Sequence, residues 1–482
     1  MNKTTISSGY ILAILGTDWH ESIEVLSAIK FFILCFLLID VVYFYIVFAK
    51  IENTYLIRKI KTRFFYFLAA IFILFIGILS IYLSQKYYYI DEKEKDRLWT
   101  ETTSSFKSKL CEIYPYNLIL RTHEAILMGK DINSLSRELA HFTFSAKRNR
   151  QLNEKEVYVF VIGETARYGN FSINGYKRET SPLLSEIENV VSYSNVYSGA
   201  NLTRLSLPII LTRVSAQNYD QYAKEKTFVD AFKEATFKTC WIANQSAENS
   251  FIQRIAMDAD DNFLTVSNAE THAWDEQLWE AFDQILSREE EKVFIVLHTL
   301  GSHAQYNFRY PEAFEVFKPA SLNNAFSYSF FSLKNKELLV NSYDNAILYT
   351  DYFLANTIKK LDSLNCNSYL MYVSDHGENL FDTEDNLSGH GGRIYSDYDF
   401  HVPFFVWYSD EYKNNYPEKV DAIIKNKDKK LSANNIFYSV LDMADIDFPG
   451  FIKEKSVAST ALIEDSVRYV LTADIECKIF EE

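Results

Sequence analysis

Carboxylate and imidazole side chains follow three apolar segments of the sequence, each where the apolar run ends. Glu164 comes directly after VYVFVIG, Asp375 and His376 come after SYLMYVS, and a loop with His303 follows VFIVLHT. Asp or Glu oxygens and His nitrogens are ligands that hold a zinc-like ion and leave a position open for a substrate oxygen or nucleophile. Each cluster alone is more typical of a cap or a turn, so the prediction of a metal site depends on their combination.

A hydroxyl nucleophile is available in the segment SGANLTRLSLP, residues 198–208. A Ser or Thr hydroxyl is unreactive unless a base or a metal ion activates it. The pattern places Thr203 near the start of a helix, and a helix N-terminus favours an anionic substrate. The chemistry predicted from these residues is metal-assisted phosphoryl transfer or a related reaction.

Short apolar runs bounded by turn signals recur after residue 156, and helix-like stretches such as TFVDAFKEA and DEQLWEAFDQILSREEE separate several of them. The runs are VYVFVIG, VVSYSNVYS, FKTCWIAN, VFIVLHT, SYLMYVSD and VPFFVWYS. This alternation predicts an α/β fold with a mostly parallel sheet flanked by helices. Chemistry in such sheets gathers at the carboxyl ends of the strands, where the polar clusters lie.

Two long apolar segments, residues 31–49 and 64–84, each have the length of a helix that spans a hydrocarbon core of roughly 30 Å. Soluble helices of this length rarely lack a polar face, so buried globular helices are the weaker alternative. The connecting loop, residues 50–63, carries basic residues against the single acid Glu52, which places it in the cytoplasm by the positive-inside rule. Its basic residues are Lys50, Arg58, Lys59, Lys61 and Arg63.

The remaining divisions follow from this transmembrane hairpin, which occupies residues 29–84. Residues 1–28 are expected to form an interfacial tail on the non-cytoplasmic side of the same membrane. Residues 85–150 are expected to form a bridging helical segment, and residues 151–482 the catalytic domain. Asp40 lies within the first span, where a carboxylate costs about 2.5–3.5 kcal/mol on insertion scales. We therefore expect it to be protonated, exposed to water or paired, and its role stays open.

Charge excludes one class of function, whereas the cysteines decide little. The net charge of -15 argues against a nucleic-acid partner, because neutralising phosphates requires clustered Lys and Arg. Outside the first apolar run the cysteines are widely separated and have no metal-type spacing. Three disulfide connectivities, or reduced thiols, remain open for Cys111, Cys240, Cys366 and Cys477.

These motifs together resemble the phosphoethanolamine transferases of Gram-negative inner membranes, which belong to the alkaline phosphatase and sulfatase superfamily. The resemblance covers most of the chain. It includes VIGETARYGNFSINGYKRETSPLL, SGANLTRLSLP, LHTLGSH, SDHGENL and the later GHG before VPFFVW. It implies an alkaline phosphatase/sulfatase-like fold in a multi-pass protein of the cell inner membrane, with the catalytic domain in the periplasm.

The resemblance also implies a role for each matching residue. Thr203 would be the nucleophile that carries phosphoethanolamine, and it would lie at a catalytic Zn²⁺ with Glu164, Asp375 and His376. Two further histidines, His303 and His390, match positions that hold a second metal or the substrate phosphate. The number of zinc ions stays open, and the spacing from His376 to His390 departs slightly from the family pattern.

The implied substrates are a membrane donor and an envelope acceptor. Thr17 and Glu21 have the spacing of the family segment that binds the donor, phosphatidylethanolamine. The acceptor would be lipopolysaccharide, at lipid A or the core, or another glycan or protein. Lipid A-modifying members have a disulfide beside the nucleophile where this chain has Ser198 and Ile209, which makes lipid A a less secure choice.

The expected function is therefore zinc-dependent transfer of phosphoethanolamine through a phosphothreonine-type intermediate. The chain resembles a member that is shortened at its N-terminus, as expected for a deletion, a misassigned start or a compact variant. Three alternatives remain. The chain could be a related phosphoglycerol transferase, a phosphate or sulfate ester hydrolase, or a catalytically dead envelope-binding protein. The formylglycine signature of sulfatases is absent, which disfavours sulfate ester cleavage.

Overall fold

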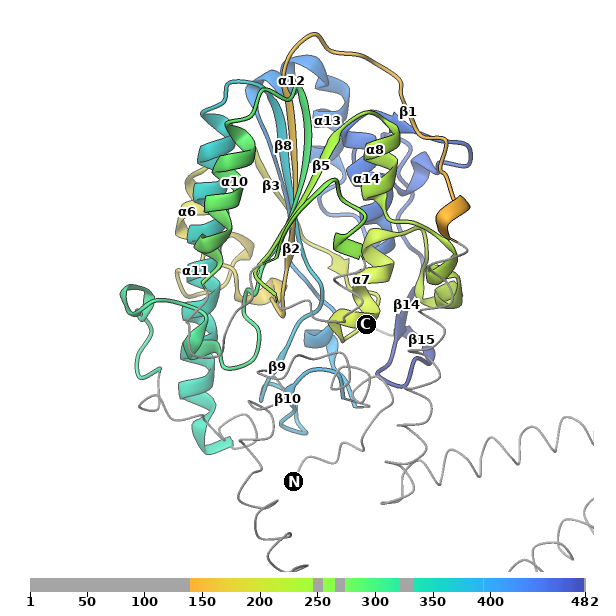
Figure 1. Ribbon diagram of the computed structural model, residues 1–482. Coiled ribbons are helices and arrows are strands. Elements are labelled where there is room, and N and C mark those ends of the chain that lie inside the picture. The colour runs from red at the N-terminus through yellow and green to blue at the C-terminus, as the bar shows by residue number, and fades with distance from the viewer. Residues whose placement is uncertain (1–138, 246–254, 265–273, 321–332, 393, 481–482) are drawn as a thin grey trace, which may run out of the picture. The chain divides into compact units, whose positions relative to one another are not determined.

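The computed structural model describes residues 139–245, 255–264, 274–320, 333–392 and 394–480 (Figure 1). The predicted tail, transmembrane hairpin and most of the bridging segment lie outside these residues, as do Thr17, Glu21, Asp40 and Cys111. Within the described ranges, no helix combines the length and the apolar character that a membrane crossing requires.

A seven-stranded mixed sheet forms the centre of the domain, in the order β3-β11-β8-β2-β7-β5-β6. Strands β8, β2, β7, β5 and β6 are parallel, whereas β11 runs antiparallel to both β8 and β3. The strands of this sheet are β2 (Glu156–Gly163), β3 (Val190–Tyr193), β5 (Lys238–Ala243), β6 (Asp261–Leu264), β7 (Lys292–His298), β8 (Asn367–Ser374) and β11 (Phe404–Tyr408).

Helices cover both faces of the sheet (Figure 1). One face packs against α6 (Pro182–Glu186), α10 (Leu278–Leu286) and α11 (Lys336–Asp362), and the other packs against α7 (Thr203–Leu211), α8 (Phe228–Glu234) and α14 (Asn434–Met443). The other α-helices of the described ranges are α12 (Asp410–Asn415) and α13 (Pro417–Lys425). Short pairs are formed by β1 (Lys147–Arg148) with β13 (Ile446–Asp447), β4 (Val196–Tyr197) with β12 (Leu431–Ser432), β9 (Asn379–Leu380) with β10 (Ser388–Gly389), and β14 (Arg468–Leu471) with β15 (Cys477–Phe480).

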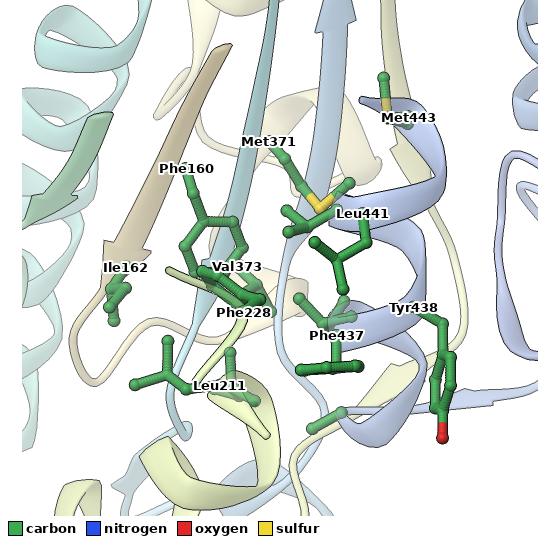
Figure 2. Close-up of a cluster of buried hydrophobic side chains, with 14 of the residues drawn as sticks. Phe160, Ile162, Leu211, Phe228, Met371, Val373, Phe437, Tyr438, Leu441 and Met443 are labelled. Carbon is green, nitrogen blue, oxygen red and sulfur yellow. The ribbon is translucent and has the colours of Figure 1, made fainter. Parts of the chain in front are cut away.

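The two-sided burial explains why the central strands read as continuous apolar runs. Along β2, the side chains of Val157, Val159 and Val161 belong to the core beneath α10 and α11. Phe160 and Ile162 belong to the core beneath α7, α8 and α14 (Figure 2). Successive strand residues point to opposite faces, so a strand covered on both sides needs apolar residues at every position.

A buried ion pair closes the end of the sheet where the strands begin. Arg148 Nη1 lies 2.5 Å from Glu156 Oε1, and the two side chains are 1% and 0% exposed. The Tyr158 hydroxyl donates to the other oxygen of Glu156 at 2.6 Å. Because β1 pairs with β13 and Phe144 and Ala146 join the core, the chain enters this unit before residue 151.

The prediction of an α/β domain with helices on its sheet is confirmed, and the sheet is mixed because β11 reverses direction. TFVDAFKEA and DEQLWEAFDQILSREEE contain α8 and α10. The sequence did not indicate the 27-residue helix α11, whose buried side chains include many polar ones. The described cysteines, Cys240, Cys366 and Cys477, form no disulfides.

The segment after β8 packs tightly against the backbone of a distant loop. Gly377 donates its N–H to the Asp399 carbonyl at 2.8 Å, and Glu378 donates its N–H to the Tyr398 carbonyl at 2.9 Å. A Cβ atom on Gly377 would lie 2.0 Å from the Tyr398 carbonyl oxygen. Only glycine permits this approach, because a backbone oxygen cannot move aside as a side chain can.

We therefore expect Gly377→Ala to lower the free energy of unfolding by about 1–3 kcal/mol, the usual cost of overpacking. The measurement is the midpoint of thermal unfolding of the purified chain. Gly169→Ala is the matched control, because a Cβ atom there meets nothing within 4 Å. Equal midpoints for the two variants would contradict the packing argument.

Candidate metal centre

Two carboxylates meet because β2 and β8 are adjacent parallel strands. Gly163 at the end of β2 is in register with Ser374 at the end of β8, so the residues that follow, Glu164 and Asp375, leave the sheet side by side. Glu164 is 1% exposed and Asp375 is fully buried. Two carboxylates at this depth require a compensating cation or protons.

His376 joins these carboxylates, as the next residue after Asp375. Its Nε2 lies 3.3 Å from Asp375 Oδ2 and 3.6 Å from Glu164 Oε1. One ligand atom from each of the three side chains lies within 4.8 Å of the others. This buried set of two oxygen donors and one nitrogen donor can hold a metal ion.

Hydrogen bonds orient the candidate ligand atoms of Asp375 and His376, and one carboxylate oxygen of Asp375 stays available for a metal ion. Asp375 Oδ1 accepts from the N–H groups of Thr165 and His376 at 3.0 and 2.7 Å. Asp375 Oδ2 is buried and accepts no hydrogen bond from the described residues. His376 Nδ1 lies 2.8 Å from the Gly377 carbonyl, so this nitrogen donates there and Nε2 is the ring nitrogen that faces the carboxylates. Both features fit a metal ion between these side chains.

Thr203 lies at the same centre. It is the first residue of α7, and its Oγ1 lies 3.2 and 3.3 Å from the oxygens of Glu164 and 3.3 Å from His376 Nε2. The predicted position of Thr203 at a helix start is confirmed. Ser198 Oγ donates to the Asp375 carbonyl, which ties the segment before α7 to the end of β8. Glu164, Thr203, Asp375 and His376 are therefore brought together from three parts of the chain.

His390 lies beside this cluster. Its ring centroid is 4.1 Å from that of His376, and its Nδ1 is 3.2 Å from each carboxylate oxygen of Glu378. Burial opposes protonation, but the carboxylate of Glu378 outweighs it and raises the pKa of His390 to about 9. A cationic imidazole at this position suits an anionic substrate.

His303 reaches the cluster from the loop after β7. Ser302 donates its N–H and its hydroxyl to the Glu164 carbonyl at 3.1 and 3.0 Å. At the positive φ of Gly301, a Cβ atom would lie 2.9 Å from that same carbonyl oxygen. Burial lowers the pKa of His303 to about 4, which keeps its imidazole neutral. The two predicted substrate-binding histidines thus differ in charge.

Other polar residues near strand ends serve the structure. His298 is fully buried on β7 and lies outside the candidate ligand set, and His401 is stacked between the rings of Tyr168 and Tyr197 at 4.3 and 4.7 Å. Arg178 forms an ion pair at 2.7 Å with the buried side chain of Asp344 on α11.

Four residues that hold the candidate ligands or their neighbours in place were given no role in the prediction from the sequence. Gln245, after β5, donates to Glu164 Oε2 at 3.1 Å, and the Thr165 hydroxyl donates to Glu164 Oε1 at 2.7 Å. The Tyr306 hydroxyl donates to Glu378 Oε2 at 2.7 Å. Position at a strand end was the available signal for Gln245, Thr165 and Glu378. Tyr306 had no such signal, because its partner lies on another segment.

Residues 156–446 match the family model described as Sulfatase. The chain belongs to the sulfatase family. The match begins at β2 and ends at the first residue of β13, so it includes the whole central sheet and every residue of the candidate metal centre.

Two phosphoethanolamine transferases are similar to this chain over somewhat more than half of its length. The phosphoethanolamine transferase EptC of Escherichia coli K12 is 29% identical over 331 residues, which cover 64% of this chain and 54% of EptC. The phosphoethanolamine transferase EptA of Escherichia coli K12 is 30% identical over 305 residues, 61% of this chain and 54% of EptA. The chain thus spans about half the length of these relatives.

Solved structures show the same fold. The C-terminal periplasmic domain of Escherichia coli EptC, crystallised in complex with Zn, superposes with a TM-score of 0.61 at 27% identity, over 67% of this chain and 91% of that domain. The integral membrane protein EptA from Neisseria meningitidis gives a TM-score of 0.73 at 23% identity, over 94% of this chain and 82% of EptA. The second likeness concerns the fold alone.

We expect Asp375→Asn to abolish metal binding, because an amide is a poor substitute for the carboxylate that faces His376 Nε2. Metal content per chain after dialysis, measured by plasma mass spectrometry, checks this. Asp351→Asn is the matched control, because this fully buried aspartate accepts from the N–H groups of Leu183 and Leu184 instead. Wild-type metal content in Asp375→Asn would rule out the proposed centre.

Proposed function

We propose that the protein transfers phosphoethanolamine from phosphatidylethanolamine to a cell-envelope acceptor, with Thr203 as the nucleophile and Zn²⁺ as the cofactor. The observation that carries this proposal is the position of the Thr203 hydroxyl, 3.2 to 3.3 Å from Glu164 and His376. A hydroxyl in contact with two candidate metal ligands, at the start of a helix, has the surroundings that an attacking group needs.

The donor set favours zinc over magnesium or calcium. Three protein ligands that include an imidazole, with a further position for a reacting oxygen, are typical of catalytic zinc sites, whereas magnesium and calcium prefer oxygen ligands. Zinc bound here would lower the pKa of the Thr203 hydroxyl, as metals do for bound water. The complex of the related EptC domain with Zn supports the same choice.

The reaction then has two displacements at phosphorus. In the first, the Thr203 oxygen bonds to the phosphorus of the donor and the bond to the diacylglycerol oxygen breaks. The proton lost by Thr203 balances the proton gained by diacylglycerol, which leaves. In the second, the oxygen of an acceptor hydroxyl bonds to the phosphorus of the phosphothreonine-type intermediate and the bond to the Thr203 oxygen breaks. The proton lost by the acceptor balances the proton that Thr203 regains. His303 and His390 stabilise charge on the transferring group or move the proton.

The proposal also includes the location of the protein in the cell and the class of molecule that accepts the phosphoethanolamine. The apolar segments 31–49 and 64–84 support a multi-pass protein of the Gram-negative inner membrane with residues 151–482 in the periplasm. The acceptor is an envelope glycolipid or glycan, or a protein. Lipid A-modifying members have a disulfide in this segment. In this chain Ile209 of α7 packs directly against Gly199, where an added Cβ atom would lie 2.6 Å from Ile209 Cδ1. Apolar packing therefore holds the segment to α7.

We expect Thr203→Ala to abolish the covalent phosphoethanolamine adduct, because the attacking oxygen is removed. The full chain is incubated with labelled phosphatidylethanolamine, and the adduct is located by mass spectrometry of the intact protein and its peptides. Ser206→Ala is the matched control, because this buried hydroxyl lies one turn along α7 and, among the described residues, hydrogen-bonds to the Thr203 carbonyl, at 3.3 Å. An adduct in Thr203→Ala would refute the mechanism.

The same assay separates the proposed donor from its main rival. Labelled phosphatidylglycerol in place of phosphatidylethanolamine should give no adduct. A glycerol-phosphate adduct on Thr203 would instead identify a phosphoglycerol transferase.

Donor binding by the N-terminal segment remains a prediction from the sequence. We expect Thr17→Ala combined with Glu21→Ala to lower transfer in whole cells at equal expression, because the donor headgroup loses its predicted contacts. The measurement is the phosphoethanolamine content of envelope fractions by mass spectrometry. Unchanged transfer would remove Thr17 and Glu21 from the donor site.

A further inference from the structure

Glu378 is a buried carboxylate to which neither the metal centre nor the two displacements assign a role. It follows His376 by two residues, and its side chain is 1% exposed. Both of its oxygens lie 3.2 Å from His390 Nδ1, and Oε2 also accepts from the Tyr306 hydroxyl at 2.7 Å. A buried carboxylate held in this way has a fixed direction.

The loop that carries His390 has a glycine on either side of this residue. Gly389 and Gly391 on either side have positive φ angles of 78° and 70°. Asn379 Nδ2 donates to the Gly389 carbonyl at 2.9 Å, which attaches the loop at one point. Asn201 Nδ2 also donates to the Gly392 carbonyl at 3.4 Å, so the backbone is attached on both sides of His390. The hydrogen bond that orients the imidazole ring itself is the one with Glu378.

The pairing also decides which nitrogen of His390 can meet a ligand. Nδ1 is engaged by Glu378, so Nε2 is the nitrogen that remains. The His390 side chain is 18% exposed, in contrast to Glu378, and its ring lies 4.1 Å from that of His376. A group bound beside His376 is therefore within reach of His390.

We propose that Glu378 is a positioning residue, which, supported by Tyr306, holds the His390 ring so that its Nε2 faces the non-bridging oxygens of the transferring phosphoryl group. This inference rests on the proposed function. A carboxylate behind an imidazole fixes the tautomer and the ring orientation, as it does in hydrolytic triads and behind metal-bound histidines.

A purely structural role for Glu378 makes a different prediction. If Glu378 only filled a buried polar site, its loss would act independently of His390. If it acts through His390, its loss should have no further effect once the imidazole is gone. A double-mutant cycle separates the two cases.

The experiment uses the full chain in detergent with labelled phosphatidylethanolamine, and follows the rate of adduct formation on Thr203. We expect Glu378→Gln and His390→Ala each to lower the rate by about 10–100-fold. We expect the double variant to be no slower than His390→Ala alone. Tyr306→Phe, which leaves the carboxylate in place, should cause a smaller loss than Glu378→Gln.

A second readout does not depend on turnover. The affinity for inorganic phosphate, measured by calorimetry on the zinc-loaded chain, should fall several-fold in Glu378→Gln and in His390→Ala. Zinc content and the midpoint of thermal unfolding are measured for each variant. Glu156→Gln is the matched control, because this buried glutamate also accepts from a tyrosine hydroxyl but lies at the opposite end of β2. Its rate and phosphate affinity should equal those of the wild type.

The outcomes are distinct. Additive losses in the double variant, or wild-type phosphate affinity in Glu378→Gln, would overturn the positioning role. A wild-type chain that forms no adduct with phosphatidylethanolamine would instead refute the proposed function. Non-additive losses with unchanged zinc content would establish that Glu378 acts through His390.

Discussion

The burial of Glu164 beside Asp375 is the constraint on which the rest of this site depends. Two ionised carboxylates removed from water repel each other and lose their hydration, which is tolerated only with a compensating positive charge. Asp375 Oδ2 accepts no hydrogen bond within the described part of the chain, and His376 presents Nε2 to the same point. The core thus brings two carboxylates together at a position where a metal ion would balance their charge. The parallel register of β2 and β8 determines this position.

The surrounding contacts hold separate segments at this position. The Ser198 hydroxyl ties the segment before α7 to the Asp375 carbonyl, and Ser302 ties the loop after β7 to the Glu164 carbonyl. The absence of a side chain at Gly301 and Gly377 lets two loops approach backbone atoms closely. Each contact is modest by itself, but together they keep Thr203 and both candidate substrate histidines close to the candidate metal ligands.

The sulfatase fold hosts several chemistries, so the family assignment fixes the framework and leaves the reaction to the site. A threonine hydroxyl within hydrogen-bond distance of two candidate ligands favours covalent transfer. The neighbouring imidazoles provide opposite electrostatic settings, since burial keeps His303 neutral while the carboxylate of Glu378 keeps His390 protonated. One site can therefore offer both a cationic group for the phosphoryl oxygens and a neutral group that can accept a proton.

The sequence by itself determined the local elements and the polar residues at their ends. Apolar runs covered on both faces located the central strands, and Thr203 was placed correctly at a helix start. Only the tertiary structure decided which strand ends are neighbours, because the strand order places β8 beside β2 although about 200 residues separate them in the chain. The sequence also left two sets of contacts undetermined, because their partners lie on separate segments of the chain. These are the ion pair between Arg178 and Asp344 and the contacts of Glu378 with Tyr306 and His390. Periodicity reports which face of an element is buried, whereas the partner across a contact depends on how distant segments pack.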